Sequence, residues 1–329
     1  MIVYNKYEKL TKEDILEDLY NYEIDKIIYR QTYGEEVDDP YNIIDELANE
    51  FIDAYILEFD DYLEEIYDSG ELDAAMAATY SPNQTFIPDT TFVMGLFNKR
   101  LDAFWSSDKR TTISAALATM YLLAVQRMNR TVAVLNSNDL QILTQLTNAS
   151  LIWMTEGTKL SVLTPILTQT LTTAIENQLS LAEATALVRS ELLDLVPPRA
   201  TVYLTTLSGI LVNMTRNMAR VVEANNQGFS GMMWLGFESD NQCDRCAALE
   251  GTIFPISGLM TLVDQISNAS TPEAFASVHP FPSWNSRDSS FVLPNGNQLS
   301  SNASPEEFIS ADIGLPPLHG ECVCQLVPV

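Results

Sequence analysis

The sequence predicts a mainly α fold of long helices, followed by a small α+β module in the last third of the chain. Three observations lead to this fold class. Apolar residues recur at three- to five-residue intervals over much of the first 226 residues. Helix-capping signals, glycines and prolines mark where individual helices begin and end. Beyond Gly228 this periodicity is lost, and all four cysteines lie there.

Residues 1–88 are predicted to form an acidic helical region. A first helix begins near Lys9 and ends before Pro40, which does not continue a helix. A second helix is expected from about Tyr41 to Asp68, because large apolar residues recur there on one stripe. These residues are Ile44, Leu47, Phe51, Tyr55, Phe59, Tyr62 and Ile66. The stripe is expected to be either part of the core or a seam that faces a partner.

Negative charge is concentrated at the start of the chain. Residues 1–80 carry 23 Asp and Glu against 5 Lys and Arg, a balance of −18 within a total of −26. Such a surface repels phosphate backbones, so neither sequence-independent binding by this region nor a sequence-specific nucleic-acid partner is expected. The acidic helices either bind a basic protein surface or serve solubility alone.

Residues 89–179 are predicted to form a helical bundle region. A proline-containing loop at residues 81–89 separates this region from the acidic one. Between residues 90 and 149 the chain is rich in Leu, Ala, Thr and Met and carries few charges. Helices that are apolar around so much of their circumference must be buried, inside a bundle or in an oligomer interface. A further helix is expected to begin at Thr164 as its N-cap and to run to about residue 179.

The helices of the predicted C-terminal domain, residues 180–329, are marked by a capping box and a pair of prolines. The capping box starts at Ser180 and begins a helix that is expected to run from 181 to 195. Pro197-Pro198 is expected to end that helix, because proline lacks the N–H group that a helix needs. Another long helix is then predicted from about 199 to 226.

Short strands and a long loop are predicted for the rest of this domain. Met232–Phe237 is expected to be a strand, and Gln325–Val329 a short terminal strand. Between them, residues 258–314 show little periodicity and many Pro, Ser and Asn residues. This segment is predicted to be a long inserted loop, and loops of such length are usually functional or locally folded.

No membrane span or secretory signal is predicted. The longest nearly uncharged apolar run, Ile113–Val125, is shorter than the roughly 20 residues that cross a bilayer. The N-terminal residues 1–6 lack the basic and apolar regions of a signal peptide. The protein is therefore expected in a cytoplasm, where cysteines stay reduced.

All four cysteines and one of the two histidines lie in two short clusters. Cys243 and Cys246 form a CxxC pair, and His319, Cys322 and Cys324 form an HxxCxC cluster. Zinc takes about four nitrogen or sulfur ligands in a tetrahedron, and CxxC supplies two thiolates from one turn. The spacing therefore predicts a zinc site. Its ligands are Cys243, Cys246 and His319 with one of Cys322 and Cys324, or the cysteines with His319 hydrogen-bonded outside the coordination sphere.

The predicted zinc is structural rather than catalytic. Thiolate-rich sites are usually closed and hold loop-rich folds together, whereas catalytic sites keep an open position beside a general base. The zinc deaminases place an HxE ahead of their CxxC, but both histidines of this chain follow it. The alternative to a metal is a disulfide between the two clusters, which a reducing cytoplasm disfavours.

No catalytic motif is found upstream of the two clusters. The sequence contains no HExxH, no glycine-rich phosphate loop, no GxSxG and no histidine before His279. The carboxylates of residues 1–80 follow helix faces and are interpreted as solvated charge. His279 is expected to be a loop residue rather than a ligand, and Trp234 a core residue. No catalytic residue is predicted, and the protein is not expected to be an enzyme.

Four segments of the chain, taken in order, resemble the MuF family, the phage Mu protein F-like minor head proteins of tailed bacteriophages. They are Arg216-Asn-Met-Ala-Arg220, Met233-Trp234, Asp240-Asn-Gln-Cys243-Asp-Arg-Cys246-Ala-Ala-Leu249-Glu-Gly251, and Pro316-Pro-Leu-His319-Gly-Glu-Cys322-Val-Cys324. The order matches an arginine-bearing helix, a Trp-containing strand, D-x-x-C-x-x-C-x-x-L-x-G, a variable loop and P-P-x-H-x-x-C-x-C. The resemblance covers roughly residues 180–329.

The resemblance implies a minor capsid component near the portal vertex that acts in head morphogenesis and in DNA packaging or delivery. The expected partners are portal, major capsid or scaffold proteins, and the expected location is the virion, after assembly in the host cytoplasm. An oligomer around the portal and the absence of membrane partners are also expected. The loop at 258–314 is longer than is usual in the family, Val323 stands where members often have Arg, and residues 1–150 match nothing in it.

Two alternatives to this function are kept. MuF modules are sometimes fused to toxin or protease domains, so the protein could be a zinc enzyme or effector carried in the phage head. It could also be a portal or scaffold adaptor, unrelated to the MuF family, that binds zinc by convergence.

Overall fold

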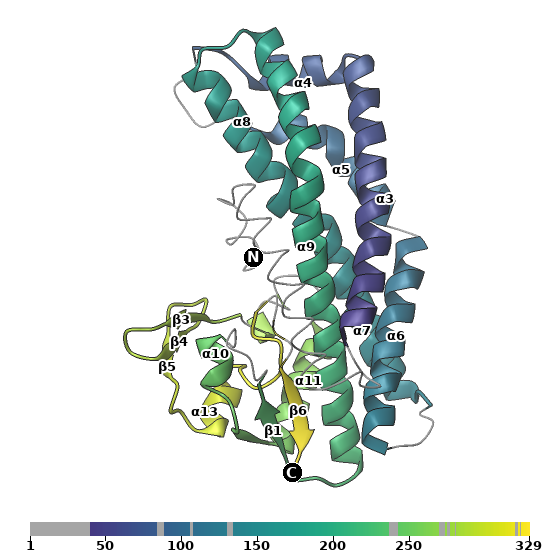
Figure 1. Cartoon of the computed structure of the whole chain (residues 1–329), viewed down its shortest axis with the longest axis vertical. Coiled ribbons are helices and arrows are strands. Elements are labelled where there is room, and N and C mark those ends of the chain that lie inside the picture. The colour runs from purple at the N-terminus through teal and green to yellow at the C-terminus, as the bar shows by residue number, and fades with distance from the viewer. Residues whose placement is uncertain are drawn as a thin grey trace.

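The computed structural model describes residues 40–83, 89–105, 108–129, 134–236, 243–269, 274, 277–279, 281–319, 322 and 324–329. The first helix predicted by the sequence, from about Lys9, and the turn before Cys243 lie outside these residues. Long helices stand side by side in an elongated bundle, and short helices and strands form a module beside its lower half (Figure 1). The fold is mainly α with a small α+β module, which confirms the predicted fold class.

The described helices of the bundle are α3 (Pro40–Asp68), α4 (Glu71–Thr79), α5 (Thr91–Trp105), α6 (Asp108–Asn129), α7 (Ser137–Gly157), the π-helix η1 (Thr158–Leu163), α8 (Thr164–Glu176) and α9 (Leu181–Asn226). The module contains the helices α10 (Asp244–Ala247), α11 (Ile256–Asn268) and α13 (Pro305–Ser310). Its strands are β1 (Gly231–Leu235), β2 (Ile253–Pro255), β3 (Ser283–Asn285), β4 (Ser290–Val292), β5 (Gln298–Ser300) and β6 (Gln325–Pro328).

The acidic helix α3 buries the apolar stripe that the sequence predicts. Of the seven stripe residues, six are buried, and they pack in the core against α9. The exception is Tyr62, which is half-buried and donates a hydrogen bond from its hydroxyl to Leu96 O at 2.7 Å. Leu63, the next residue, is fully buried in its place. The stripe is therefore core. The exposed carboxylates of α3 are Glu46, Glu50, Asp53, Asp61, Glu65 and Asp68.

Helix α9 is the central element of the molecule and packs against α3, α6, α7, α8 and α11. Its 46 residues form one continuous helix, so the prediction that Pro197-Pro198 ends a helix is wrong. A proline inside a helix costs about 3 kcal/mol. Val196 and Ala200, on either side of the prolines, are fully buried, and this packing keeps the helix continuous. The capping box at Ser180 is confirmed.

The chain passes from α7 to α8 without a break, through the π-helix η1. Thr164 is therefore not an N-cap, and this prediction is wrong. Its hydroxyl donates instead to Lys159 O at 2.9 Å, inside the continuing helix. At Gly157 the ring and hydroxyl of Tyr203, from α9, press against the helix where a Cβ would otherwise stand. The wider π-turn follows directly after this close contact.

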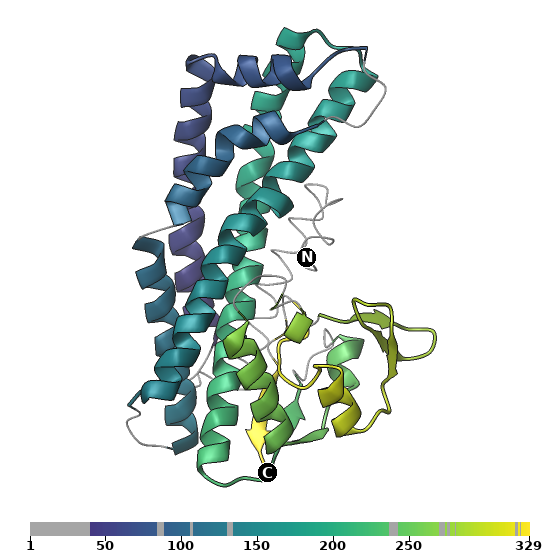
Figure 2. The ribbon, with the colours of Figure 1, turned by 180° about the vertical axis from the view of Figure 1, so that it is seen from behind.

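Helix α9 is long and apolar enough, by length and composition, to cross a membrane. In this fold 67% of its most apolar window is buried inside the protein. Helices α7 and α11 lie beside it when the molecule is seen from behind (Figure 2). Its apolar composition is thus accounted for by its place in the core of the bundle.

The strands predicted at both ends of the module pair with each other. The sheet has the order β2-β1-β6 and is antiparallel throughout, with Trp234 opposite Leu326. One face, which includes Met232, Trp234 and Phe254, is fully buried against the core. The pairing brings the two cysteine-containing segments, which flank β1 and β6, to the same side of the module.

The sequence predicted a long loop over the segment 258–314. The structure differs, because this segment contains helices and strands. Helix α11 occupies its first part and packs its apolar face on α9 and α7. This face is formed by Leu259, Leu262, Val263 and Ile266, whose spacing of three and four residues is helical. The antiparallel sheet β3-β4-β5 and helix α13 follow. The helical periodicity of α11 covers only a short stretch of sequence, and the Pro, Ser and Asn residues around it obscured the pattern.

The buried apolar side chains of the bundle and the module form one connected core, from Ile43 to Leu326. The domain boundaries expected near residues 88 and 180 stay predictions. Helix α9 extends through both parts, since its first half packs among the bundle helices and its second half also contacts β6 and α11. The module is therefore attached to the bundle along a shared helix rather than by a linker.

Candidate metal centre

Two tight turns present the predicted ligands. Cys243 stands at the N-terminus of α10, and the N–H groups of Cys246 and Ala247 both donate to its carbonyl at 3.0 Å. In the second turn Cys322 N–H donates to His319 O at 3.2 Å, and Cys324 directly precedes β6. Because β1 and β6 are paired, the two turns face each other.

The structure brings together all five residues predicted as ligands. Nε2 of His319 lies 3.1 Å from Cys243 Sγ and 3.4 Å from Cys246 Sγ. On its other side, Cys246 Sγ lies 3.6 Å from Cys322 Sγ. Two triads whose ligand atoms lie within 4.8 Å of one another result: Cys243, Cys246 and His319, and Cys246, Cys322 and Cys324. Cys246 belongs to both.

This Cys/His cluster, as we call these five residues, has the dimensions of a metal site. With bonds of about 2.3 Å to sulfur and 2.0 Å to nitrogen, the edges of a tetrahedral zinc site are about 3.8 Å between sulfurs and 3.5 Å between sulfur and nitrogen. The observed separations of 3.6, 3.4 and 3.1 Å lie within a few tenths of these values. All four cysteines are described, and none is in a disulfide. The cluster could hold a metal ion.

Protonation is shared unequally among the thiols. The pKa of Cys243 is lowered to about 4, first by its hydrogen bond with Cys246 and then by His319, against the effect of burial. The same hydrogen bond raises the pKa of Cys246. Burial by itself raises the pKa of Cys322, but hydrogen bonds from Cys246 and Cys324 lower it overall. These hydrogen bonds thus favour the thiolate, the charged form that binds metals, at Cys243 and Cys322.

The fourth thiol and the histidine complete this pattern. The hydrogen bond with Cys246 lowers the pKa of Cys324, but the bond with Cys322 and burial outweigh it, so the net shift is upward. For His319, burial lowers the pKa, but the contact with the Cys243 sulfur and the charge of Cys322 raise it overall. The five side chains of the cluster therefore share protons, and a bound cation can displace these protons.

Two asparagines of α9 hold the second turn, and sequence analysis missed both. Asn213 Nδ2 donates to Cys322 O at 2.6 Å and to Cys324 O at 3.3 Å. Asn217 Nδ2 donates to Cys324 O at 3.1 Å, and Asn217 Oδ1 accepts from Leu326 N–H at 2.8 Å. Both side chains are fully buried. The available signal was an amide residue recurring at i and i+4 on the helix.

The Asn217 amide makes the two hydrogen bonds that a neighbouring strand would otherwise make to the edge of β6. In an extended chain the carbonyl of one residue and the N–H two residues later point to the same edge. Cys324 O and Leu326 N–H are such a pair on the edge of β6 that faces away from β1. One side-chain amide satisfies both, which leaves no open edge at this point.

Two arginines of α9 continue the same buried stripe. Arg216 Nη2 donates to Gln325 Oε1 at 2.9 Å, and Arg220 Nη1 donates to the same oxygen and to Leu326 O at 3.4 Å. Arg216 is fully buried, and Arg220 nearly so. Helix α9 thus contacts the backbone or side chain of every residue from Cys324 to Leu326.

Two further residues considered in the sequence lie where expected. His279 is buried outside both triads, and its Nε2 lies 3.2 Å from Leu315 O. Burial lowers its pKa to about 4, so the imidazole is neutral near pH 7. Trp234 is fully buried and packs edge-on against Phe254. Neither residue contributes a ligand to the triads.

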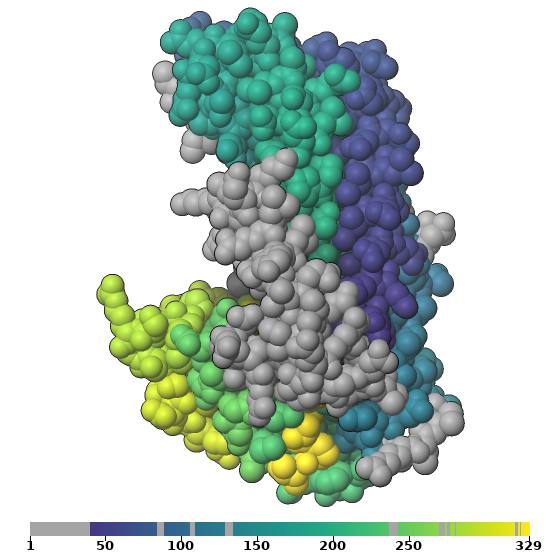
Figure 3. All heavy atoms as spheres, viewed as in Figure 1, coloured from purple at the N-terminus to yellow at the C-terminus, as the bar shows by residue number. Residues whose placement is uncertain are grey.

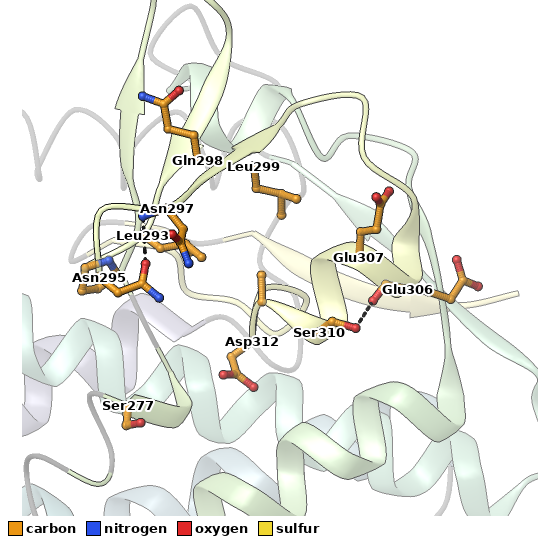
Figure 4. A pocket seen from close by; sticks show the side chains of 12 residues that line it. Ser277, Leu293, Asn295, Asn297, Gln298, Leu299, Glu306, Glu307, Ser310 and Asp312 are labelled. Atoms are coloured by element: carbon orange, nitrogen blue, oxygen red, sulfur yellow. Dashed lines mark hydrogen bonds between the residues drawn. The ribbon is translucent and has the colours of Figure 1, made fainter.

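A cleft of about 930 Å³ lies between the β4–β5 hairpin and α13. Its lining combines amides, three carboxylates and a few apolar residues. The charged side chains do not converge: Glu306, Glu307 and Asp312 point in different directions (Figure 4). Glu307 is moreover engaged in capping α13, where its Oε2 accepts from Ser304 N–H at 2.8 Å. Among the described residues, the Cys/His cluster is therefore the better candidate for a functional site than this cleft.

Comparison with protein-family models, with curated proteins and with solved structures found no match to this chain.

Proposed function

We propose that this protein is a structural minor component of the head of a tailed bacteriophage, placed near the portal and active in head morphogenesis and in DNA packaging or delivery. The observation that carries the proposal is that the four MuF-like segments pack into one unit. Asn217 of the first segment donates to Cys324 O of the fourth, Gly251 N–H of the third donates to Trp234 O of the second, and Cys243 of the third contacts His319 of the fourth. Residues that match a family in order and also meet in space are expected of a shared fold unit.

Within this function, we propose that the ion of the Cys/His cluster is zinc and that its role is structural. Thiolate-rich donor sets select zinc among the abundant divalent cations, and closed sites of this kind stabilise small modules. The module has two three-stranded sheets and short helices, so its own core is small. Metal binding contributes on the order of 10 kcal/mol in small zinc domains, enough to decide whether such a module folds.

Metal analysis and hydrogen exchange test the structural role. The purified protein should contain about one zinc per chain. In Cys246→Ser, amide protection should fall across β1, β2, β6 and α11, while α3 and α6, which are built on their own apolar faces, keep theirs. A metal content near zero with four freely titratable thiols contradicts the zinc site. Protection retained in the module without the metal contradicts the structural role and favours a zinc enzyme or effector carried in the head.

The acidic helices are the proposed docking surface for a basic partner in the head, such as a portal, capsid or scaffold protein. Helices α3 and α4 carry 12 carboxylates and no basic residue. Within the part of the chain that the structure describes, Arg100 pairs with Glu58 and Arg189 pairs with Glu64. The upper part of helix α3 lies along one edge of the molecule and is exposed on the face shown (Figure 3). Charge complementarity of this kind directs the choice and orientation of a partner.

The docking test must keep α3, because deleting it removes part of the core. We expect the variant Asp53→Asn, Asp61→Asn and Glu65→Gln, whose three carboxylates lie on the side of α3 away from the core, to fold normally but to enter heads poorly during infection. The matched control neutralises three exposed carboxylates elsewhere: Asp194→Asn, Asp264→Asn and Glu306→Gln. Equal incorporation of both variants would reject the docking role, and absence of the wild-type protein from purified heads would reject the proposed function itself.

A further inference from the structure

We infer that the Cys/His cluster offers one metal ion two overlapping ligand sets, in which His319 and Cys324 replace each other beside the constant ligands Cys243, Cys246 and Cys322. This inference rests on the proposed metal centre and concerns how the ion is held there. Five donors for four positions leave one donor over. The structure indicates which donors are interchangeable.

Cys246 is the constant member of both triads. It contacts His319 at 3.4 Å on one side and Cys322 at 3.6 Å on the other. His319 therefore adjoins Cys243 and Cys246, whereas Cys324 adjoins Cys246 and Cys322. Each of the two candidates for the fourth position already lies beside two of the three constant sulfurs. Conversion of one ligand set into the other requires one of these two side chains to leave the ion as the other approaches it.

The spare donor is kept in place independently of the metal. Asn213 and Asn217 bind the carbonyl of Cys324 from the rigid helix α9, and β6 begins directly after it. His319 is held differently, since its own carbonyl accepts from Cys322 N–H within the second turn. Either residue thus stays within reach of the ion when the other occupies the fourth position.

The two ligand sets differ in charge and in the number of thiolates. With a divalent ion, three thiolates and a neutral imidazole give a centre of charge −1, and four thiolates give −2. The number of thiolates is directly visible when cobalt(II) replaces zinc, because the sulfur-to-cobalt charge-transfer absorption grows with each thiolate. The exchange can therefore be followed without any assay of phage assembly.

The test uses the full chain with zinc and cobalt(II) and four variants: His319→Ala, Cys324→Ser, the double variant of these two, and Cys246→Ser. Both single variants should bind about one ion per chain, whereas the double variant and Cys246→Ser should lose tight binding in competition with a chelator. The charge-transfer absorption of cobalt in His319→Ala should exceed that in Cys324→Ser, since four thiolates then replace three. Far-UV circular dichroism checks that the helices are intact.

The possible outcomes distinguish a failure of the ligand exchange from a failure of the proposed metal centre. If either single variant loses the ion as completely as Cys246→Ser, the ligand set is fixed and the exchange is rejected. A three-thiolate absorption in His319→Ala means that water fills the fourth position, which also rejects it. If Cys246→Ser fails to fold, the double variant still decides, because it keeps all three constant sulfurs. A wild-type protein that binds no metal at all rejects the metal centre itself.

Discussion

The side-chain amide of Asn213 donates to the carbonyl oxygen of Cys322 at 2.6 Å, across 109 positions of sequence. Asn213 is fully buried on the central helix α9, and Cys322 belongs to the Cys/His cluster. The backbone of a predicted metal ligand is thus fixed by the bundle and not by the small module alone. The stability of the module and its affinity for metal are therefore expected to depend on residues of α9.

Asn217→Ala should destabilise the protein by about 2–4 kcal/mol, because it leaves Cys324 O and Leu326 N–H buried without this partner. The free energy of unfolding, measured in urea, gives the size of the loss. Chelator competition should show weaker metal binding in the same variant. The control is Asn226→Ala, an exposed asparagine at the end of the same helix, which should change the stability by less than about 0.5 kcal/mol. Similar losses in both variants would contradict the role assigned to Asn217.

Gly157→Ala should destabilise the bundle, because the new Cβ would overlap the ring and hydroxyl of Tyr203. That ring cannot easily move, since it is buried and its hydroxyl donates to Trp153 O at 2.8 Å. Overpacking of this kind costs about 1–3 kcal/mol or more. Thermal unfolding measures the effect.

Gly95→Ala is the matched control for Gly157→Ala. Gly95 also lies inside a helix, α5, but is exposed, and among the described residues no atom beyond its own helix backbone lies within 4 Å of a Cβ built on it. Alanine should therefore stabilise the helix there, by about 0.5–1 kcal/mol. The two substitutions are identical and should have opposite signs. The same sign for both would mean that Tyr203 adjusts and that the close contact at Gly157 is not a constraint.

His279→Gln should reduce the loss of stability on acidification. Burial lowers the pKa of His279 from 6.5 to about 4, so the unfolded chain binds the extra proton first. Stability is complete above about pH 6.5 and falls as the pH approaches 4, by at most about 3 kcal/mol from this residue. Glutamine does not titrate and can donate to Leu315 O in the same way. The measurement is the free energy of unfolding of both proteins between pH 7.5 and 5.

The difference between His279→Gln and the wild type isolates the histidine. Acid also protonates the residues of the proposed metal centre, but this loss is common to both proteins and cancels in the comparison. The wild-type stability should fall more steeply with decreasing pH than that of the variant. Parallel pH profiles would show that His279 titrates normally in the folded protein.

Sequence patterns were sufficient where one local signal dominated. The stripe from Ile44 to Ile66 predicted α3 almost to the residue, because seven large apolar side chains share one face. The five residues of the Cys/His cluster were found because they are the right donor types at ligand spacing. The partner strands β1 and β6 were both predicted, and their pairing follows from the need to bring the two turns together.

The errors arose where tertiary packing outweighed a local signal. Pro197-Pro198 should end a helix, but the burial of α9 on both sides of the prolines maintains it. Thr164 resembled an N-cap because the π-turn before it has no sequence signature. Asn213 and Asn217 were missed because an asparagine inside a helix is locally unfavourable, and its compensation, the backbone of residues 322–326, comes from more than 100 residues away.

The separation of the two half-sites has a consequence for biosynthesis. Seventy-two residues lie between Cys246 and His319, so at about 5–20 residues per second the ribosome needs on the order of 4–14 s to add the second half-site after the first. During this interval the CxxC thiols have no partner turn, and the polar stripe of α9 lacks the strand that it later holds. For several seconds the emerging chain therefore exposes the polar side chains of α9. They gain their hydrogen-bond partners only when β6 has been synthesised.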